Sequence, residues 1–191
     1  MKKGTIIIIA VVAVVVILIG SVIGNYNSLA TAREEVAAAE SNIDTYLQRR
    51  ADLIPNLVKT AKQFADHETE VFDKVLAARE KLVGADTIED KANADAELTS
   101  ALQDFTLVVE NYPELKSDAQ YTQLMDELAG SENRIATARK DYNDKVNEYN
   151  SKIIKFPTSL IANMFGFEKA EYFEAAEGAE TAPDVDELFG E

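Results

Sequence analysis

The uncharged run at residues 4–23, GTIIIIAVVAVVVILIGSVI, constrains this chain more than any other feature. It has twenty residues, and fourteen of them are Ile, Val or Leu. As an α-helix it would span about 30 Å, the thickness of a bilayer's hydrocarbon core. A lone strand in lipid would leave its backbone groups unpaired, so the run predicts a transmembrane helix. Because the apolar run is longer than the usual core of a signal peptide, we expect a retained anchor, with a short stub, over residues 1–24.

The charges around this run predict its orientation. Lys2 and Lys3 precede it, and the first basic residue after it is Arg33. Positive charge is retained in the cytoplasm, so we expect a cytoplasmic N-terminus in the cell membrane and a body on the periplasmic or extracellular side. The formal charge is −15, which becomes −17 without the two lysines. Such a body is not expected to bind nucleic acid or an anionic lipid surface through its net charge.

Apolar residues recur at helical spacing through most of the remaining chain. They run from Leu29 to Leu82 as one amphipathic stripe, then from Leu98 to Tyr112, and from Tyr121 to Phe156. Gly84, Ala85 and Asp86 end the first stripe, and the stretch from there to about Asn93 is predicted as a polar connection. The pattern predicts an all-α fold in which a single N-terminal transmembrane helix precedes an antiparallel up-down bundle of three to four long helices, over residues 25–157.

Proline and serine mark the expected ends of these helices. Pro55 leaves two alternatives, a kink or a break near Arg50 to Asp52, and the continuous phase of the stripe slightly favours the kink. Ser117 with Gln120 predicts a capping box before the last long helix, which Pro157 ends. Beyond it we expect a short amphipathic helix over residues 158–173 and an acidic, disordered tail over residues 174–191.

Several residues are candidate contacts with a second copy or with a partner. Gly20 and Gly24 form a small-xxx-small pair that would let two anchors approach closely, although the spacing can also be incidental. Arg50 falls on the apolar stripe, where it would pair with an acid on another helix or bind an anionic ligand. Tyr142 and Tyr149, seven residues apart, are interpreted as packing residues, within or between subunits.

The apolar residues around Phe165 and Phe167 would close one end of the bundle or lie on another surface. In the tail, Val185, Leu188 and Phe189 indicate either a docking peptide or a solvated terminus.

No combination of residues predicts a reaction. A di-iron site in a bundle needs two Glu-x-x-His motifs, and the chain has one histidine, His67, expected at the solvent edge of a helix. Cysteine is absent, which excludes disulfides, thiolate metal sites and a cysteine nucleophile. Phosphate-loop and hydrolase motifs are absent as well. We therefore expect no enzyme activity, no cofactor and no metal.

Specific motifs resemble the LemA family. They are QRRADLIPNLV at residues 48–58, ENYPELK at 110–116, ENRI at 132–135, the Tyr-Asn pairs at 142 and 149, and FGF at 165–167. The resemblance covers about residues 25–173, and it departs at Glu40, where the family often has tryptophan. It implies a bacterial single-pass membrane protein with a helical body and no established enzymatic activity or cofactor. A related protein of magnetotactic bacteria is associated with building magnetosome membranes, and family genes often lie near those of membrane zinc peptidases.

Two functional hypotheses follow. The first is a non-catalytic scaffold of the cell envelope, a homo-oligomer in contact with the lipid bilayer that organises or shapes membrane. The alternative is an adaptor or regulator of a membrane peptidase or another envelope complex, docked through the tail or the Phe165 region.

Overall fold

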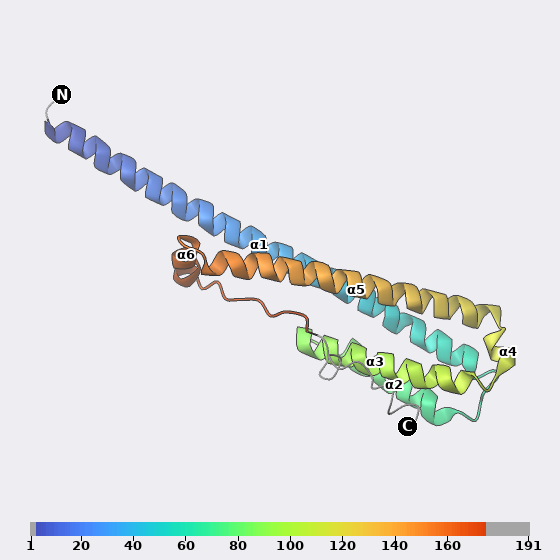
Figure 1. The fold of residues 1–191 in the computed structure, drawn as a ribbon. Helices are drawn as coiled ribbons and strands as arrows, with labels where there is room; N and C mark the ends of the chain where they lie inside the picture. Colours follow the sequence, from blue (N-terminus) through green and yellow to red (C-terminus); the bar gives the residue numbers. More distant parts are fainter. Residues whose placement is uncertain (1–2, 175–191) are drawn as a thin grey trace, which may run out of the picture. The chain divides into compact units, whose positions relative to one another are not determined.

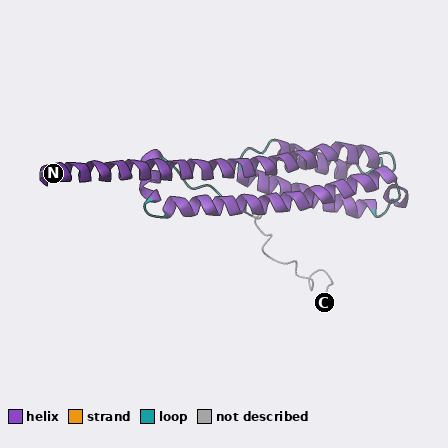
Figure 2. Cartoon of the chain, turned by 90° about the horizontal axis from the view of Figure 1, so that it is seen from above, coloured by secondary structure: helices purple, strands orange, loops and turns teal. Residues whose placement is uncertain are grey.

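The computed structural model describes residues 3–174, and its regular structure is helical throughout that range (Figures 1 and 2). The all-α prediction is confirmed, with no strand between residues 3 and 174. The helices are α1 Lys3–Ala61, α2 Thr69–Val83, α3 Ile88–Val109, α4 Pro113–Lys116, α5 Ala119–Ile154 and α6 Thr158–Phe165. The predicted docking peptide and most of the predicted disordered tail lie outside the described residues.

The anchor prediction agrees with the first helix. By length and composition, the N-terminal part of α1 can cross a membrane, and none of its most apolar window is buried within the chain. The helix then continues past Pro55 to Ala61, so the break considered near Arg50 is absent. Ile54 and Leu57, on either side of the proline, are fully buried, and their packing offsets the hydrogen bond that proline removes.

The chain reverses over residues 62–68, which the sequence analysis did not predict. The stripe from Leu29 to Leu82 belongs to two helices, so its assignment to one helix is wrong. The Arg79 side chain donates to the Ala51 carbonyl oxygen at 3.1 Å, which pairs positions almost equidistant from the turn. The three- and four-residue spacing of apolar residues continues from α1 through the turn into α2, so periodicity alone did not reveal the reversal. Phe72, outside the predicted stripe, is fully buried in α2.

The chain divides into two compact units. Of the described residues, 3–41 and 140–171 form one unit, which we call the anchor unit, and 42–139 and 172–174 belong to the other, which we call the bundle unit. Both α1 and α5 contribute to each. The sequence analysis instead assigned residues 25–157 to one bundle.

Ion pairs define the helix directions in the bundle unit. Lys81 pairs with Glu97 at 2.6 Å, and Lys74 with Asp104, so α2 and α3 are antiparallel. Helices α1 and α3 are parallel, because their pairs keep a nearly constant separation in sequence: Asp44 with Lys91 at 2.7 Å and Arg50 with Asp95 at 2.5 Å. Helix α5 runs against α1, with Arg49 3.8 Å from Glu127. The order is therefore up-down-up-down.

Two predicted helix starts need correction. Helix α3 begins at Ile88 and not near Asn93, because the Thr87 hydroxyl accepts from the Asp90 amide at 3.0 Å and caps it. The α5 cap is Asp118 and not Ser117: Asp118 Oδ1 accepts from the Tyr121 amide at 2.8 Å. Ser117 instead follows the last residue of the short helix α4, and its hydroxyl donates to the Pro113 carbonyl oxygen of that helix at 3.0 Å.

In the anchor unit, α5 runs antiparallel to α1, and Lys145 lies 3.1 Å from Glu35. Helix α5 ends at Ile154, so Phe156 of the predicted heptad row lies beyond it and is 81% exposed. Helix α6 begins at Thr158, where the short helix was predicted, but it ends at Phe165 and not at residue 173, because Gly166 stops it. Gly166, at φ 70°, ends it in the left-handed conformation and donates its amide to the Ala162 carbonyl oxygen.

Candidate membrane and protein contact sites

Arg50 belongs to a buried charge cluster in the bundle unit. Its side chain is 5% exposed, and its Nη1 lies 2.5 Å from Asp95 Oδ1 and 2.7 Å from Glu132 Oε2. Its Nη2 donates to the Thr99 hydroxyl at 3.0 Å. Arg139 binds the other Asp95 oxygen, Oδ2. The structure therefore shows the structural pairing, with acids on α3 and α5, that was one of the two alternatives for Arg50.

The cluster's charges cancel. Two guanidinium groups face two carboxylates, and these partners offset the cost of burying the Asp95 side chain, which is 2% exposed. The Nε atoms of Arg50 and Arg139 are buried without a hydrogen bond. Such pairing selects one alignment of α1, α3 and α5, because a shift by one residue would bury unpaired charges.

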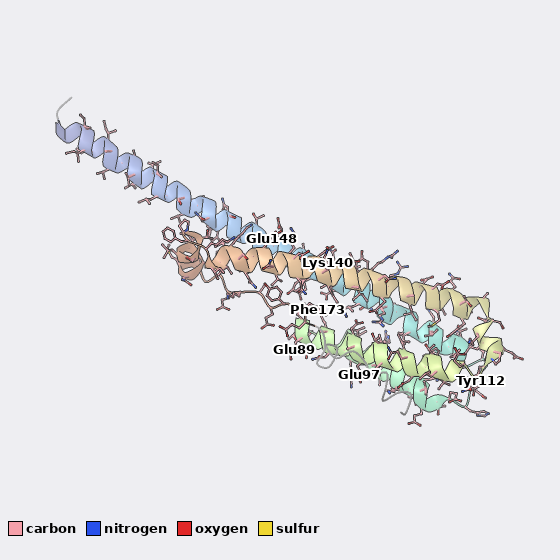
Figure 3. The ribbon with its side chains drawn as sticks, in the orientation of Figure 1. Glu89, Glu97, Tyr112, Lys140, Glu148 and Phe173 are labelled. Carbon is pink, nitrogen blue, oxygen red and sulfur yellow. The ribbon has the colours of Figure 1, made fainter. Side chains whose placement is uncertain are left out.

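Sequence reasoning missed Asp95 and Arg139. Asp95 follows residues expected to form a polar connection, and Arg139 lies on a flank of the α5 stripe. The Arg139 guanidinium carbon also lies 4.6 Å from the ring centre of Phe173, in the extended segment after α6 (Figure 3). No sequence signal distinguished this aspartate from the other acidic residues.

Aromatic residues join α1 to α6 in the anchor unit. The Tyr26 ring centre lies 4.9 Å from that of Phe165 and 5.6 Å from that of Phe167. The Arg33 guanidinium carbon lies 5.5 Å from the Phe167 ring centre. Phe167 is buried and Phe165 half-exposed, so these neighbouring phenylalanines have different surroundings.

Tyr142 and Tyr149 are buried within the chain. The Tyr142 hydroxyl donates to the Glu171 carbonyl oxygen at 2.9 Å. Burial raises the pKa of Tyr142 to about 12, with further contributions from Glu40 and Glu171. Burial also raises the pKa of Tyr149. The folded single chain thus uses both rings internally.

Asn150, the second residue of the Tyr-Asn pair at 149, has a structural role of its own. Its side-chain oxygen accepts from the Ala170 amide, and its Nδ2 donates to the Ala170 carbonyl oxygen, both at 2.9 Å. These two bonds fix the segment after α6 to α5.

Gly20 and Gly24 lie on an open face of α1. A Cβ added at either position meets no atom within 4 Å, so the fold of the single chain does not require glycine there.

The described part of the chain holds no group of three or more His, Asp or Glu residues able to bind a metal ion. The His67 side chain is 94% exposed, as expected, but it lies in the turn at residues 62–68 and not on a helix.

The apolar helix and the helical body define a membrane-associated helical protein. The LemA family model matches residues 39–186, and the chain belongs to the LemA family. It is 32% identical to magnetosome protein MamQ 2 of Paramagnetospirillum magneticum, over 93% of this chain and 75% of that protein. It is 30% identical to MamQ of Magnetospirillum gryphiswaldense, over 87% of this chain and 71% of that protein. It is 27% identical to protein LemA of Metamycoplasma hominis, over 87% of this chain and 76% of that protein.

Proposed function

We propose that this protein is a non-catalytic scaffold of the cell envelope, anchored in the bilayer, that self-associates to organise or shape membrane. The observation that carries the proposal is the distribution of uncovered apolar side chains. Outside the apolar run at residues 4–23, most of the large exposed ones belong to the anchor unit: Tyr26, Ile154, Phe156, Leu160, Met164 and Phe165. Concentrated apolar exposure marks a protein or membrane contact. Similarity to magnetosome proteins supports a role at a membrane.

Self-association is tested on full-length protein in mild detergent and in lipid nanodiscs, by light-scattering mass. We expect multimers in both. The double variant Gly20→Leu with Gly24→Leu adds bulk where a single chain leaves open space, so its fold should be unchanged. If two anchors pack through this face, the association constant should fall by roughly tenfold, equivalent to about 1.4 kcal/mol.

The matched control is Val11→Phe with Val15→Phe, which adds bulk to the opposite face of the same helix. It should leave the mass distribution unchanged. A strictly monomeric wild type, together with vesicles whose shape does not change on reconstitution, would contradict the scaffold.

We also propose that the N-terminus is cytoplasmic and the body outside. Because the chain has no cysteine, a single Asp141→Cys substitution creates a unique, exposed thiol on α5. A membrane-impermeant maleimide should label it in intact cells, after outer-membrane permeabilisation where such a membrane exists. Labelling only after lysis of the cell membrane would reverse the orientation.

A groove in the bundle unit favours the alternative, an adaptor for a membrane peptidase or another envelope complex. It has a volume of about 520 Å³, and its lining includes Leu102 and the exposed Leu107 of α3. A photo-crosslinking residue at position 107 separates the two functions. Adducts between copies of this chain support the scaffold, whereas adducts with one other envelope protein support the adaptor.

A further inference from the structure

We propose that α6 and the residues just before it lie in the interfacial layer of the bilayer, as a second membrane contact beside the anchor helix. The interfacial patch consists of five exposed apolar residues: Ile154, Phe156, Leu160, Met164 and Phe165. The inference rests on the anchoring contained in the proposed function and does not depend on self-association.

The first argument is position. The Thr158 hydroxyl, at the start of α6, donates to Asn25 Oδ1 at 2.7 Å. Asn25 lies two residues after Ile23, the last residue of the apolar run, or about 3 Å further along the helix. The ring contact between Phe165 and Tyr26 joins the other end of α6 to the same turn of α1. Helix α6 therefore lies at the level where the anchor leaves the hydrocarbon core.

Helix α6 also has an uncovered apolar face. Ile161 and Ala162 are buried against the rest of the chain, whereas Leu160 is 58% and Met164 is 64% exposed. Leu160 and Met164 are four residues apart and share one helix face, and Phe156, in the turn before α6, is exposed as well. A short helix with one apolar face uncovered has the form of an interfacial helix.

The third argument is charge. Among its 191 residues the chain has 34 Asp and Glu, yet residues 4–33 and 149–167 contain none. These two acid-free segments meet through Asn25 and Thr158. Lys152 and Lys155 lie in the second, where their ammonium groups suit lipid phosphates. The local charge at this end is therefore positive although the whole chain is strongly negative.

Together these arguments favour lipid over a protein as the occupant of the patch. The anchor brings a bilayer to the level of Asn25 whether or not other chains are present. After α6, Gly166 and the buried Phe167 direct the chain back toward α5. The patch therefore lies on a short segment that leaves α5 and returns to it.

The test uses full-length protein in phosphatidylcholine vesicles with phosphatidylglycerol. A single Met164→Cys substitution carries an environment-sensitive fluorophore, which is unique because the chain has no cysteine. The control fluorophore is placed by Asp141→Cys on an exposed face of α5, about 20 Å of helix before Ile154. Bilayer-resident nitroxide lipids and aqueous iodide serve as quenchers.

We expect position 164 to be quenched by nitroxide lipid at least about threefold more than position 141, and by iodide about threefold less. Equal iodide quenching at the two positions would overturn the inference. Protection from iodide without quenching by lipid would also overturn it, because a second copy would then cover the patch.

A second variant checks the apolar contribution. Phe156→Gln with Leu160→Gln replaces exposed side chains only, and should reduce lipid quenching at position 164 by roughly twofold or more. The matched control, Leu107→Gln, changes an exposed leucine of the bundle unit and should have no effect. Unchanged quenching in the double variant would contradict the proposal. Neither outcome alters the mass measurements that test self-association.

Discussion

The two units satisfy their buried polar groups in different ways. The bundle unit places formal charges at its centre, where Asp95 is bound by both Arg50 and Arg139. The anchor unit uses neutral hydrogen bonds, from the Tyr142 hydroxyl and the Asn150 amide to backbone groups. Charge pairing is demanding in geometry, whereas amide and hydroxyl bonds fasten an irregular segment to a helix without a buried charge.

The units also differ at their surfaces. In the bundle unit, the large apolar residues left exposed are Val83, Leu107 and Tyr172, which lie far apart in sequence. In the anchor unit they concentrate around α6. The comparison teaches that the bundle unit buries most of its large apolar side chains, whereas the anchor unit leaves a group of them uncovered at α6.

The largest expected effect tests the buried charges. Asp95→Ala leaves Arg139 without its carboxylate and Arg50 with Glu132 alone, and should destabilise the bundle unit by about 3–5 kcal/mol. The measurement is urea unfolding of the detergent-solubilised full-length chain, followed by helical circular dichroism. A loss below about 1 kcal/mol would mean that water reaches the cluster and satisfies the arginines.

The next effect tests the aromatic contact of the anchor unit. Phe167→Ala removes a buried ring beneath Arg33 and Tyr26, and should cost about 3 kcal/mol locally. Hydrogen exchange at the α6 amides should rise steeply. Phe156→Ala, which removes an exposed ring, should leave exchange in detergent nearly unchanged. Equal protection of α6 in both variants would show that Phe167 does not hold this helix.

A smaller effect tests the neutral hydrogen bonds. Tyr142→Phe keeps the ring and removes the bond to Glu171, at an expected cost of about 1 kcal/mol near neutral pH. The folded pKa of Tyr142, about 12, exceeds its ordinary value of 10, so folding favours the protonated phenol. Its contribution is complete below pH 10 and is lost as the pH rises through the window from 10 to 12.

Paired unfolding measurements from pH 8 to 12 check this sign. The stability difference between wild type and Tyr142→Phe should shrink across that window. A difference that grows with pH would contradict the assigned direction of the pKa shift.

The smallest effect is expected at an exposed ion pair of the bundle unit. Glu97→Ala, two residues from Asp95 on α3, breaks the pair with Lys81 and should change stability by less than about 1 kcal/mol. The change should vanish in 1 M salt, because screening already weakens the exposed pair. A cost similar to that of Asp95→Ala would remove the distinction between central and peripheral charges.

Local features made much of the fold predictable. The buried positions Leu29, Val36 and Ile43 follow directly from spacing by seven, and so do Tyr121, Leu128 and Ile135. The turn at residues 62–68 was not predictable in this way, because the apolar phase continues through it. The α5 cap was assigned one residue early, since Ser117 and Asp118 both have the chemistry of a cap.

The candidate contact residues show the same limit. Arg50 was recognised as unusual on an apolar stripe, but spacing named neither of its partners, Asp95 and Glu132. Tyr142 and Tyr149 were recognised as packing residues, and the partner of Tyr142, the Glu171 carbonyl oxygen, comes from a segment that sequence reasoning did not connect to α5.

By itself, the sequence determined the apolar anchor, the helical class and the buried faces, because hydrophobicity and helical period are properties of neighbouring residues. Only the tertiary structure decided where α1 ends and the chain reverses into α2, and which carboxylate neutralises Arg50. It alone also decided that α6 contacts Asn25, at the end of the anchor. Those outcomes depend on contacts between residues 28 to 133 positions apart, and the energy of such contacts appears only once the chain has brought them together.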